Sequence, residues 1–305
     1  MRKAALLVLL FALVPYAAAG TITSVVVYGD SLSDNGNLYA ATGQPASPPY
    51  FQGRRSNGPV AVEDLAKTLN VPLNDLAWIG ATTGIGNYAD GGTPTSLGIG
   101  PLPGMAVELN QTAPLVPGLA ASGALFVVWG GPNDFLSPSP LDGTPQAVAD
   151  RAAADIVGIV TALQNLGAQN ILVPDMPDLG LTPYFQSLGP VAAAGGSQIT
   201  DYFNARLLSE LPSGVIFFDT AGLMRSIVAN PGAYGFTDVT DPCFNGTTVC
   251  ANPDQYLFYD SFHPSAAAHA ILGAEFASAV PEPATCVLVF SGALVVLRRK
   301  KLLRQ

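Results

Sequence analysis

The chain has 305 residues, of which 49% are hydrophobic and 11% are charged, and its formal net charge at pH 7 is −9. Nucleic acids bind to basic surfaces, so this acidic chain, which has no stripe of lysines and arginines in its central part, is not expected to bind nucleic acid. Roughly 260 residues lie between two apolar terminal segments, enough for one large domain with its own core. We expect this domain to occupy residues 20–280.

The first residues have the order of a secretory signal peptide. Arg2 and Lys3 precede an apolar run over residues 4–14, and the run is followed by Ala17-Ala18-Ala19, a small-residue pattern of the kind that signal peptidase cleaves. We therefore predict a signal peptide over residues 1–19 and export of the remaining chain. A buried first helix of the domain is the alternative.

The stretch VVVYGDSLSDNGN, residues 25–37, places Ser31 just after a short apolar run. The run over residues 25–28 is β-branched and aromatic and too short for a stable helix, which indicates a parallel strand that is buried on both faces. Ligands of open α/β sheets bind beyond the carboxyl ends of the strands, where peptide N–H groups become available. This position suits a nucleophile, although a polar turn that merely contains a serine has the same pattern.

Three features follow before the next strand. Residues 58–70 have apolar side chains at helical spacing, which predicts a helix. Gly80 follows a short apolar run, and its backbone N–H is a candidate hydrogen-bond donor at a position where a side chain would collide. A loop glycine without such a role is the alternative. The segment 84–104 is dense in glycine and proline, and we interpret it as a surface excursion in preference to a flexible flap over a site.

Strands and helices then alternate along the chain. The candidate strands are residues 124–131, 170–173 and 215–218, and the candidate helices are a long one from Pro145 to a stop at Gly167 and one around residues 199–211. This alternation is typical of a parallel sheet with right-handed crossovers. We therefore predict an α/β fold, a three-layer α/β/α sandwich with a central, mostly parallel sheet.

An asparagine follows the predicted strand 124–131. In WGGPNDFL, residues 129–136, Asn133 is placed at the same sheet edge as Ser31. An acyl carbonyl under attack develops an oxyanion, which preorganised hydrogen-bond donors stabilise. Asn133 is therefore a candidate donor, and a turn or helix-cap role is the alternative.

The chain has only two histidines, which restricts the choice of a catalytic base. A serine that attacks at neutral pH needs a base with a pKa near ~6.5. In YDSFHPSAAAHAILGAEF, residues 259–276, Asp260 stands close enough before His263 to orient its imidazole, and Pro264 stands where a helix can start. His269 lies inside that helix, and we interpret it as a packed or surface residue. The spacing of the two histidines matches no usual metal site, and no metal or other cofactor is expected.

Three cysteines are present, and Cys286 belongs to the C-terminal segment. In an exported domain the other two, Cys243 and Cys250, are predicted to form a disulfide. Asn245-Gly246 between them is a favourable turn pair.

The C-terminal segment combines a Pro-Glu-Pro turn at residues 281–283, an apolar run over residues 284–297 and the basic cluster Arg298-Arg299-Lys300-Lys301. The apolar run is shorter than the ~20 residues of a stable membrane-spanning helix, and the basic end agrees with the positive-inside rule. This order resembles the bacterial PEP-CTERM sorting tail, so we assign residues 281–305 to a sorting and transient membrane segment. The resemblance implies a Gram-negative bacterium, processing by an exosortase after signal peptidase, and a location in the cell envelope, at the cell surface or outside the cell. A core helix with a charged tail is the alternative.

Four ordered blocks in the domain resemble the GDSL lipase/esterase family, whose members are also called SGNH hydrolases. The blocks are Gly29-Asp30-Ser31-Leu32 with Ser33-Asp34-Asn35-Gly36-Asn37, then Gly80, then Gly131-Pro132-Asn133-Asp134, and last Asp260-Ser261-Phe262-His263-Pro264. The resemblance implies a flavodoxin-like sheet, Ser31 as nucleophile, His263 as base and Asp260 as the carboxylate that orients the base. It also implies an oxyanion hole formed by the backbone N–H groups of Ser31 and Gly80 and by the Asn133 side chain. Trp78 and Ile79 depart from the small residues often found before the family's glycine.

The resulting expectation is a secreted serine esterase or lipase that hydrolyses a small-molecule or lipid ester through an acyl-enzyme. An acetylesterase acting on acylated exopolysaccharide is the alternative within this class, because PEP-CTERM tails accompany polysaccharide export in bacteria that carry them. A non-catalytic matrix or binding protein on the same fold is the alternative from another class. The intact set of Ser31, Asp260, His263 and Asn133 argues against that second alternative.

Overall fold

A five-stranded parallel sheet forms the middle of the domain. The computed structural model describes residues 21–281, of which residues 22–280 form one compact unit. The strands are β1 (Val25–Gly29), β2 (Leu73–Asp75), β3 (Leu125–Trp129), β4 (Asn170–Pro174) and β5 (Ile216–Phe218), and they pair in the order β2-β1-β3-β4-β5. Every pairing in this sheet is parallel. The predicted parallel sheet is confirmed, and β2 is an addition to the predicted strands.

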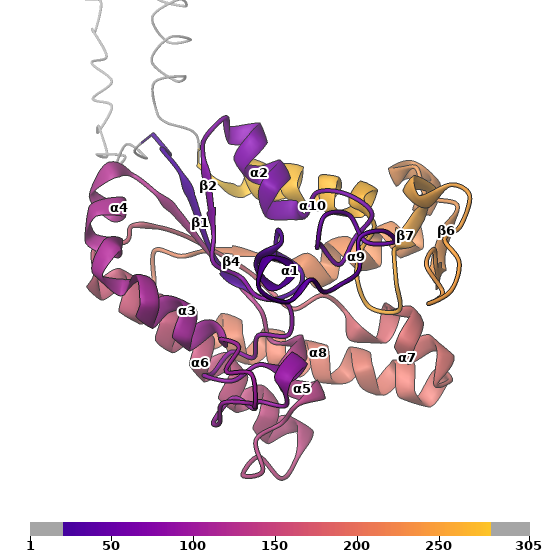
Figure 1. Cartoon of the computed structure of the whole chain (residues 1–305), viewed down its shortest axis with the longest axis horizontal. Helices are drawn as coiled ribbons and strands as arrows, with labels where there is room; N and C mark the ends of the chain where they lie inside the picture. The colour runs from indigo at the N-terminus through magenta and orange to yellow at the C-terminus, as the bar shows by residue number, and fades with distance from the viewer. Residues whose placement is uncertain (1–20, 282–305) are drawn as a thin grey trace, which may run out of the picture. The chain divides into compact units, whose positions relative to one another are not determined.

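Helices cover both faces of this sheet (Figure 1). One face packs against α3 (Met105–Thr112), α4 (Val116–Ser122), α6 (Pro145–Asn165) and α8 (Pro190–Glu210), and the other against α2 (Ala61–Leu69) and α10 (Ala266–Ala279). Successive side chains of a strand point to opposite faces, so Val26 and Tyr28 join the first core and Val25 and Val27 the second. The predicted three-layer α/β/α sandwich is thereby confirmed.

The helix α8 begins earlier than its apolar pattern predicts. Its first residue is Pro190, whereas the sequence indicated a helix around residues 199–211. Gly195 and Gly196 interrupt the apolar pattern and conceal the first turns. Gly196 is needed for packing, because a Cβ there would lie 2.9 Å from the backbone nitrogen of Gly180. Close approach to the preceding loop therefore explains glycine inside this helix.

The remaining elements are short. They are the helices α1 (Asn37–Thr42), α5 (Pro132–Leu136), α7 (Pro183–Ser187) and α9 (Thr220–Ala229), the single turns η1 (Tyr88–Asp90), η2 (Ala113–Leu115), η3 (Leu179–Leu181), η4 (Pro231–Tyr234) and η5 (Pro253–Gln255), and a separate parallel pair, β6 (Asp238–Pro242) and β7 (Tyr256–Phe258). Within residues 21–281 no helix has both the length and the apolar composition to cross a membrane. The predicted signal peptide, and the sorting tail beyond Pro281, lie outside the described residues.

The glycine- and proline-rich segment 84–104 is held in place by hydrogen bonds. Asn87 is fully buried, and its Nδ2 donates to the carbonyl oxygens of Ile79 at 3.1 Å and Pro103 at 3.0 Å. Asp90 accepts from the Leu102 N–H at 2.8 Å. These contacts close the base of the segment and give it a defined course.

Candidate active site

The turn after β1 presents Ser31 at the carboxyl end of the sheet. Gly29 ends the strand, and a Cβ there would lie 2.7 Å from the carbonyl oxygen of Trp129, so glycine is required between β1 and β3. The Asp30 carbonyl then accepts from the Ser33 N–H at 3.0 Å and closes the turn. The Ser31 N–H itself donates no hydrogen bond within residues 21–281. Both this N–H and the hydroxyl are therefore available at the point where the strand order reverses, which is where such sheets bind ligands.

Asp34 fixes the turn and connects it to the segment before Gly80. Its carboxylate accepts from the N–H groups of Gly36 at 2.7 Å and Asn37 at 2.6 Å, which starts helix α1. The other carboxylate oxygen accepts from the Ile79 N–H at 2.7 Å. The block after Ser31 thus orders its own turn and also fixes the chain immediately before Gly80.

The last block brings an imidazole to Ser31. Asp260 Oδ1 accepts from the backbone N–H groups of Phe262 at 2.9 Å and His263 at 2.8 Å. In the same turn His263 Nδ1 lies 2.8 Å from Asp260 Oδ1, and His263 Nε2 lies 2.8 Å from Ser31 Oγ. The structure therefore brings Ser31, His263 and Asp260 into one continuous chain of contacts.

Asp260 is held as a carboxylate. Burial favours its neutral form, but the charge of His263 and the hydrogen bonds from His263 and Phe262 outweigh burial and hold the pKa of Asp260 well below its usual range. A further hydrogen bond comes from Tyr50, whose Oη donates to Asp260 Oδ2 at 2.7 Å. Burial and the charge of Asp260 raise the Tyr50 pKa, so this phenol remains a donor. An ionised Asp260 can orient the imidazole and stabilise its protonated form.

Gly80 borders the same cavity as Ser31. Its φ of +84° is favourable only for glycine, and a Cβ there would lie 2.4 Å from Asn87 Oδ1. Like that of Ser31, the Gly80 N–H donates no hydrogen bond to any described residue. The site thus contains two free backbone donors.

Asn133, at the start of α5, also lines this cavity. Its Nδ2 donates to the carbonyl oxygen of Ala81 at 3.0 Å and, over a longer distance of 3.3 Å, to Asp30 Oδ2. Burial raises the pKa of Asp30 to about 7, against the opposing effects of the Leu32 N–H and His263. The neighbouring Asp134 accepts from the Thr83 N–H at 3.0 Å and so fixes the turn that carries Asn133. The Asn133 amide is therefore at the site but hydrogen-bonded to the protein.

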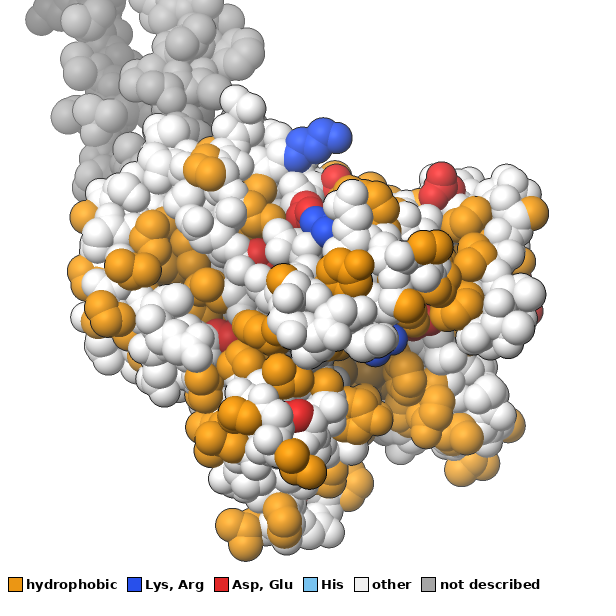
Figure 2. All heavy atoms as spheres, in the orientation of Figure 1, with side chains coloured by type: hydrophobic (Ala, Val, Ile, Leu, Met, Phe, Trp, Pro, Cys, Tyr) orange, Lys and Arg blue, Asp and Glu red, His pale blue; other side chains and the backbone are white. Residues whose placement is uncertain are grey.

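A mostly apolar cavity of about 810 Å³ opens at Ser31. Its apolar and aromatic walls include Leu32, Leu38, Ile79, Leu136, Leu179, Tyr184 and Phe262. Figure 2 shows a hollow near the middle of the visible surface, with hydrophobic side chains around much of it and a small basic area at its edge. Among the described residues no group of three histidine, cysteine, aspartate or glutamate side chains is arranged to hold a metal ion.

Comparison with known proteins agrees with this geometry. Residues 25–276 match the model of the family described as GDSL-like Lipase/Acylhydrolase. The chain belongs to the GDSL family. Its relatives include Thermolabile hemolysin of Vibrio parahaemolyticus, 27% identical over 81% of this chain and 61% of the relative, and Phosphatidylcholine-sterol acyltransferase of Aeromonas hydrophila, 31% identical over 74% and 66%. A third is Esterase EstA of Pseudomonas aeruginosa, 31% identical over 82% of this chain and 46% of the relative. The chain thus spans about half to two thirds of the length of these relatives.

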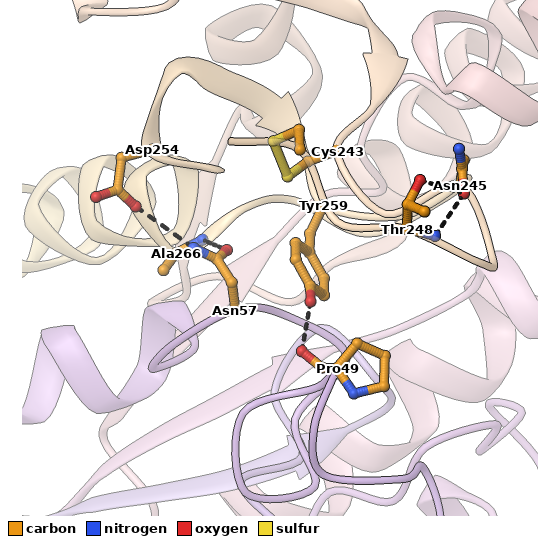
Figure 3. The surroundings of a disulfide bond; sticks show 9 residues. Pro49, Asn57, Cys243, Asn245, Thr248, Asp254, Tyr259 and Ala266 are labelled. Carbon is orange, nitrogen blue, oxygen red and sulfur yellow. Dashed lines mark hydrogen bonds between the residues drawn. A yellow bond between two sulfur atoms is a disulfide. The ribbon is translucent and has the colours of Figure 1, made fainter. Parts of the chain in front are cut away.

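A disulfide stands beside the site of this GDSL protein. Cys243 and Cys250 are bonded, with their Cα atoms 4.8 Å apart, as the sequence led us to expect. The turn between them is organised by Asn245 Oδ1, which accepts from the Thr248 N–H at 2.9 Å. Figure 3 shows Tyr259 between this bridged turn and Pro49, whose carbonyl oxygen accepts a hydrogen bond from Tyr259 Oη. The bridge therefore lies next to the strand end that leads to Asp260.

The second histidine of this GDSL protein is a core residue. His269 is 1% exposed, and its Nδ1 accepts from the Ala61 N–H at 3.2 Å, which joins α10 to the start of α2. Burial, with a smaller effect of the His263 charge, lowers the pKa of His269 to about 3. His269 is the packed residue that the sequence suggested.

Two residues of the site had no signal in the sequence. Tyr50 and Arg55 lie in the loop after α1, and both line the cavity. Arg55 Nη1 donates to Tyr50 Oη at 3.2 Å, and the guanidinium lies 5.1 Å from the centre of the Tyr50 ring. The residues around Arg55, GRRSNG at 53–58, resemble the segment that follows the first block in the family, but nothing in their spacing indicates a contact with Asp260.

Proposed function

We propose that this GDSL family member is an exported serine esterase or lipase that hydrolyses carboxylic esters through an acyl-enzyme on Ser31. The observation that carries the proposal is the contact of Ser31 Oγ with His263 Nε2 at 2.8 Å, with Asp260 at 2.8 Å from the other ring nitrogen. A hydroxyl, a base and an orienting carboxylate in this order are the requirements for a serine nucleophile.

In the first step Ser31 Oγ attacks the acyl carbon and its proton passes to His263 Nε2. The carboxylate of Asp260 stabilises the imidazolium that forms. The free N–H groups of Ser31 and Gly80 are the donors for the oxyanion of the tetrahedral intermediate. Asn133 becomes the third donor by giving up its longer contact, the 3.3 Å hydrogen bond to Asp30.

In the second step the intermediate breaks its bond to the alcohol, which leaves with the proton from His263. The acyl group remains as an ester on Ser31. His263 then takes a proton from water, the hydroxide attacks the acyl-enzyme, and the acid is released as Ser31 recovers its proton. Each step uses the same base and the same oxyanion donors.

Two further observations support an ester of appreciable size. The cavity of about 810 Å³ is within the range of sites for drug-sized ligands and far exceeds an acetyl group, so we propose longer acyl chains as substrates in preference to acetylated polysaccharide. The names of the relatives, an esterase and an acyltransferase, are those of proteins that act on acyl esters.

Export, signal-peptidase and exosortase processing, and location at the cell surface remain proposals supported by the terminal sequence patterns.

Covalent labelling tests the nucleophile. A fluorophosphonate should label the purified protein at Ser31, and Ser31→Ala should abolish both labelling and turnover of nitrophenyl esters, as should His263→Ala for turnover. Ser33→Ala is the matched control, because Ser33 Oγ is buried in the same turn and has no hydrogen-bond partner. Equal labelling of Ser31→Ala and the unmodified protein would refute the assignment. The lack of turnover on any ester from acetate to palmitate would favour a binding protein.

A further inference from the structure

A tyrosine from the loop after α1 completes the surroundings of the Asp260 carboxylate. Oδ1 of Asp260 accepts from the N–H groups of Phe262 and His263, which belong to its own turn. Oδ2 has no backbone donor among residues 21–281, and its partner from outside the turn is Tyr50, whose Oη lies 2.7 Å away. His263 Nδ1 lies 2.8 Å from Oδ1 and 2.9 Å from Oδ2. Without Tyr50, Oδ2 would therefore be held by the imidazole alone.

Arg55 fixes the direction of the Tyr50 hydrogen bond. Its Nη1 donates to Tyr50 Oη at 3.2 Å, and a guanidinium carries donors but no acceptor. Tyr50 Oη must therefore accept from Arg55, and its one proton points to Asp260. An ionised Asp260 only accepts, so His263 Nδ1 carries a proton and Nε2 remains the acceptor for the Ser31 hydroxyl. All the hydrogen bonds from the guanidinium to the proposed nucleophile thus have a defined direction.

The ring of Tyr50 is held by its neighbours. The residue is 9% exposed, and its ring packs edge-on against Phe244 and Tyr259, with centroids 5.7 Å and 5.6 Å away. The Arg55 guanidinium lies 5.1 Å from the ring centre. The Pro49 carbonyl, next to Tyr50 in the chain, accepts from Tyr259 Oη (Figure 3). The phenol hydroxyl therefore has a fixed position beside the carboxylate.

We propose that Tyr50 is a positioning residue for ester hydrolysis, which aligns the Asp260 carboxylate with His263, and that Arg55 keeps Tyr50 in this donor role. This inference rests on the proposed esterase function and adds two residues to its site. A donated hydrogen bond also stabilises the charge of the carboxylate and so weakens its attraction for a protonated base. Without the phenol, the carboxylate should be less well aligned, and the protonated base should persist to higher pH.

The test compares pH profiles of kcat and KM for nitrophenyl butyrate on the full chain. Tyr50→Phe keeps the ring and removes only the hydroxyl. Its plateau kcat should fall about 10-fold, part of the contribution of acid–base catalysis, with KM within about twofold of the unmodified value. The acidic limb of kcat/KM should move upward by about 0.5–1 pH unit.

Tyr259→Phe is the matched control. It removes a hydroxyl from the same aromatic cluster, and with it the contact to Pro49 that anchors the loop, but this hydroxyl does not contact Asp260. Its plateau kcat and its acidic limb should equal those of the unmodified protein. The comparison separates the hydrogen bond to the carboxylate from the anchoring of the loop.

Two substitutions of Arg55 test the direction of the hydrogen bond. Arg55→Lys keeps a cation that can only donate, so its profile should stay close to that of the unmodified protein. Arg55→Gln offers a carbonyl that can accept the Tyr50 proton and draw it away from Asp260. Its acidic limb and plateau kcat should therefore change in the same direction as those of Tyr50→Phe.

Three further titratable groups lie near the proposed base. Asp30, after β1, is close enough to respond to the charge of His263, and burial raises its pKa to about 7. Tyr259, after β7, responds to the charge of Asp260, and His269, in α10, to that of His263. In the described chain the side chains of these three hydrogen-bond elsewhere. Their effects remain when the Tyr50 hydroxyl is removed, so a shift between the two profiles belongs to that hydroxyl.

Several results would overturn the proposal. An acidic limb that does not move in Tyr50→Phe would do so, and an equal movement in Tyr259→Phe would show that only the anchoring of the loop matters. A change confined to KM would place the Tyr50 hydroxyl on the substrate instead. If Tyr50→Phe does not fold, the Arg55 variants decide, because equal profiles for Arg55→Gln and Arg55→Lys would contradict the directed hydrogen bond. Turnover in these cases leaves the esterase function standing, whereas an unmodified protein that turns over no ester would refute that function and the role of Tyr50 with it.

Discussion

Removal of the Cys243–Cys250 disulfide should lower both stability and activity, by different routes. The bridge joins residues seven apart and so closes a loop of eight residues. Loss of the chain-entropy restraint on so short a loop corresponds to ~2.5 kcal/mol. At roughly 2–4 °C per kcal/mol for a domain of this size, the melting temperature of Cys243→Ser/Cys250→Ser should fall by about 5–10 °C.

The effect on activity follows from the contacts of the bridged turn. The Cys243 N–H donates to the Phe258 carbonyl at 3.1 Å and the Phe244 N–H to the Tyr259 carbonyl at 2.6 Å, so the turn is tied to the strand that leads to Asp260. Phe244 also lines the cavity. We therefore expect kcat for a nitrophenyl ester to fall severalfold at temperatures where the variant is still folded.

Calorimetry and ester kinetics on the same preparations separate the two effects, and peptide mass mapping shows whether the bridge is present. Free thiols at both positions in the protein isolated from its host would refute the bridge. A double variant with a lower melting temperature but full kcat well below it would show that the bridge acts only as a staple. An unchanged melting temperature would contradict the entropic estimate.

Three further substitutions test individual parts of the site and the core. Asn133→Ala should lower kcat by about 10²–10³, as loss of one oxyanion donor does; a change confined to KM would show that Asn133 is structural. Gly80→Ala should destabilise by ~1–3 kcal/mol and impair kcat, because the new Cβ would lie 2.4 Å from Asn87 Oδ1, whereas Gly91→Ala, with a similar φ of +79° and open space, should keep its kcat. Similar kcat losses in both glycine variants would contradict the steric reasoning. The pKa of His269 is lowered to about 3 in the folded chain, so below pH ~6.5 the unfolded chain takes up a proton that the folded chain does not. The free energy of unfolding therefore decreases as pH falls, by roughly 2 kcal/mol at pH 5 from this residue. His269→Gln should remove this contribution, so the free energy of unfolding in urea should decrease less between pH 7 and pH 5 than it does in the unmodified protein. Equal decreases in the two proteins would refute the role of His269.

The parts of the fold that could be predicted from sequence are those whose burial is complete. β1, β3 and β4 are apolar at successive positions because helices cover both faces, and that pattern is visible without a structure. β6, with the sequence DVTDP and partly exposed side chains, has no such pattern, and its pairing with β7 depends on the tertiary contacts. Short polar strands are therefore the elements that sequence patterns miss.

Some residues of the candidate site could be predicted from sequence and others could not. Ser31, Asn133 and His263 each lie in a motif that indicates a catalytic role, so their proximity could be predicted from these motifs and the topology. The contact of Tyr50 with Asp260 joins residues that are 210 positions apart, and the loop around Tyr50 has no regular periodicity. The position of Tyr50 depends on long-range contacts with Asp260 and Tyr259, which the local sequence does not encode. For this reason Tyr50 and Arg55 became apparent only in the folded chain.

Because Ser31 and His263 lie far apart along the chain, they are synthesised at different times. The two residues are in contact but 232 positions apart. At ~5–20 residues per second, a ribosome makes the proposed base on the order of 12–46 s after the proposed nucleophile. During that interval the nascent chain contains a serine turn without a partner to activate it, and any product that terminates early has no base at all. Esterase activity would thus report that synthesis has passed His263, close to the end of the domain at Val280.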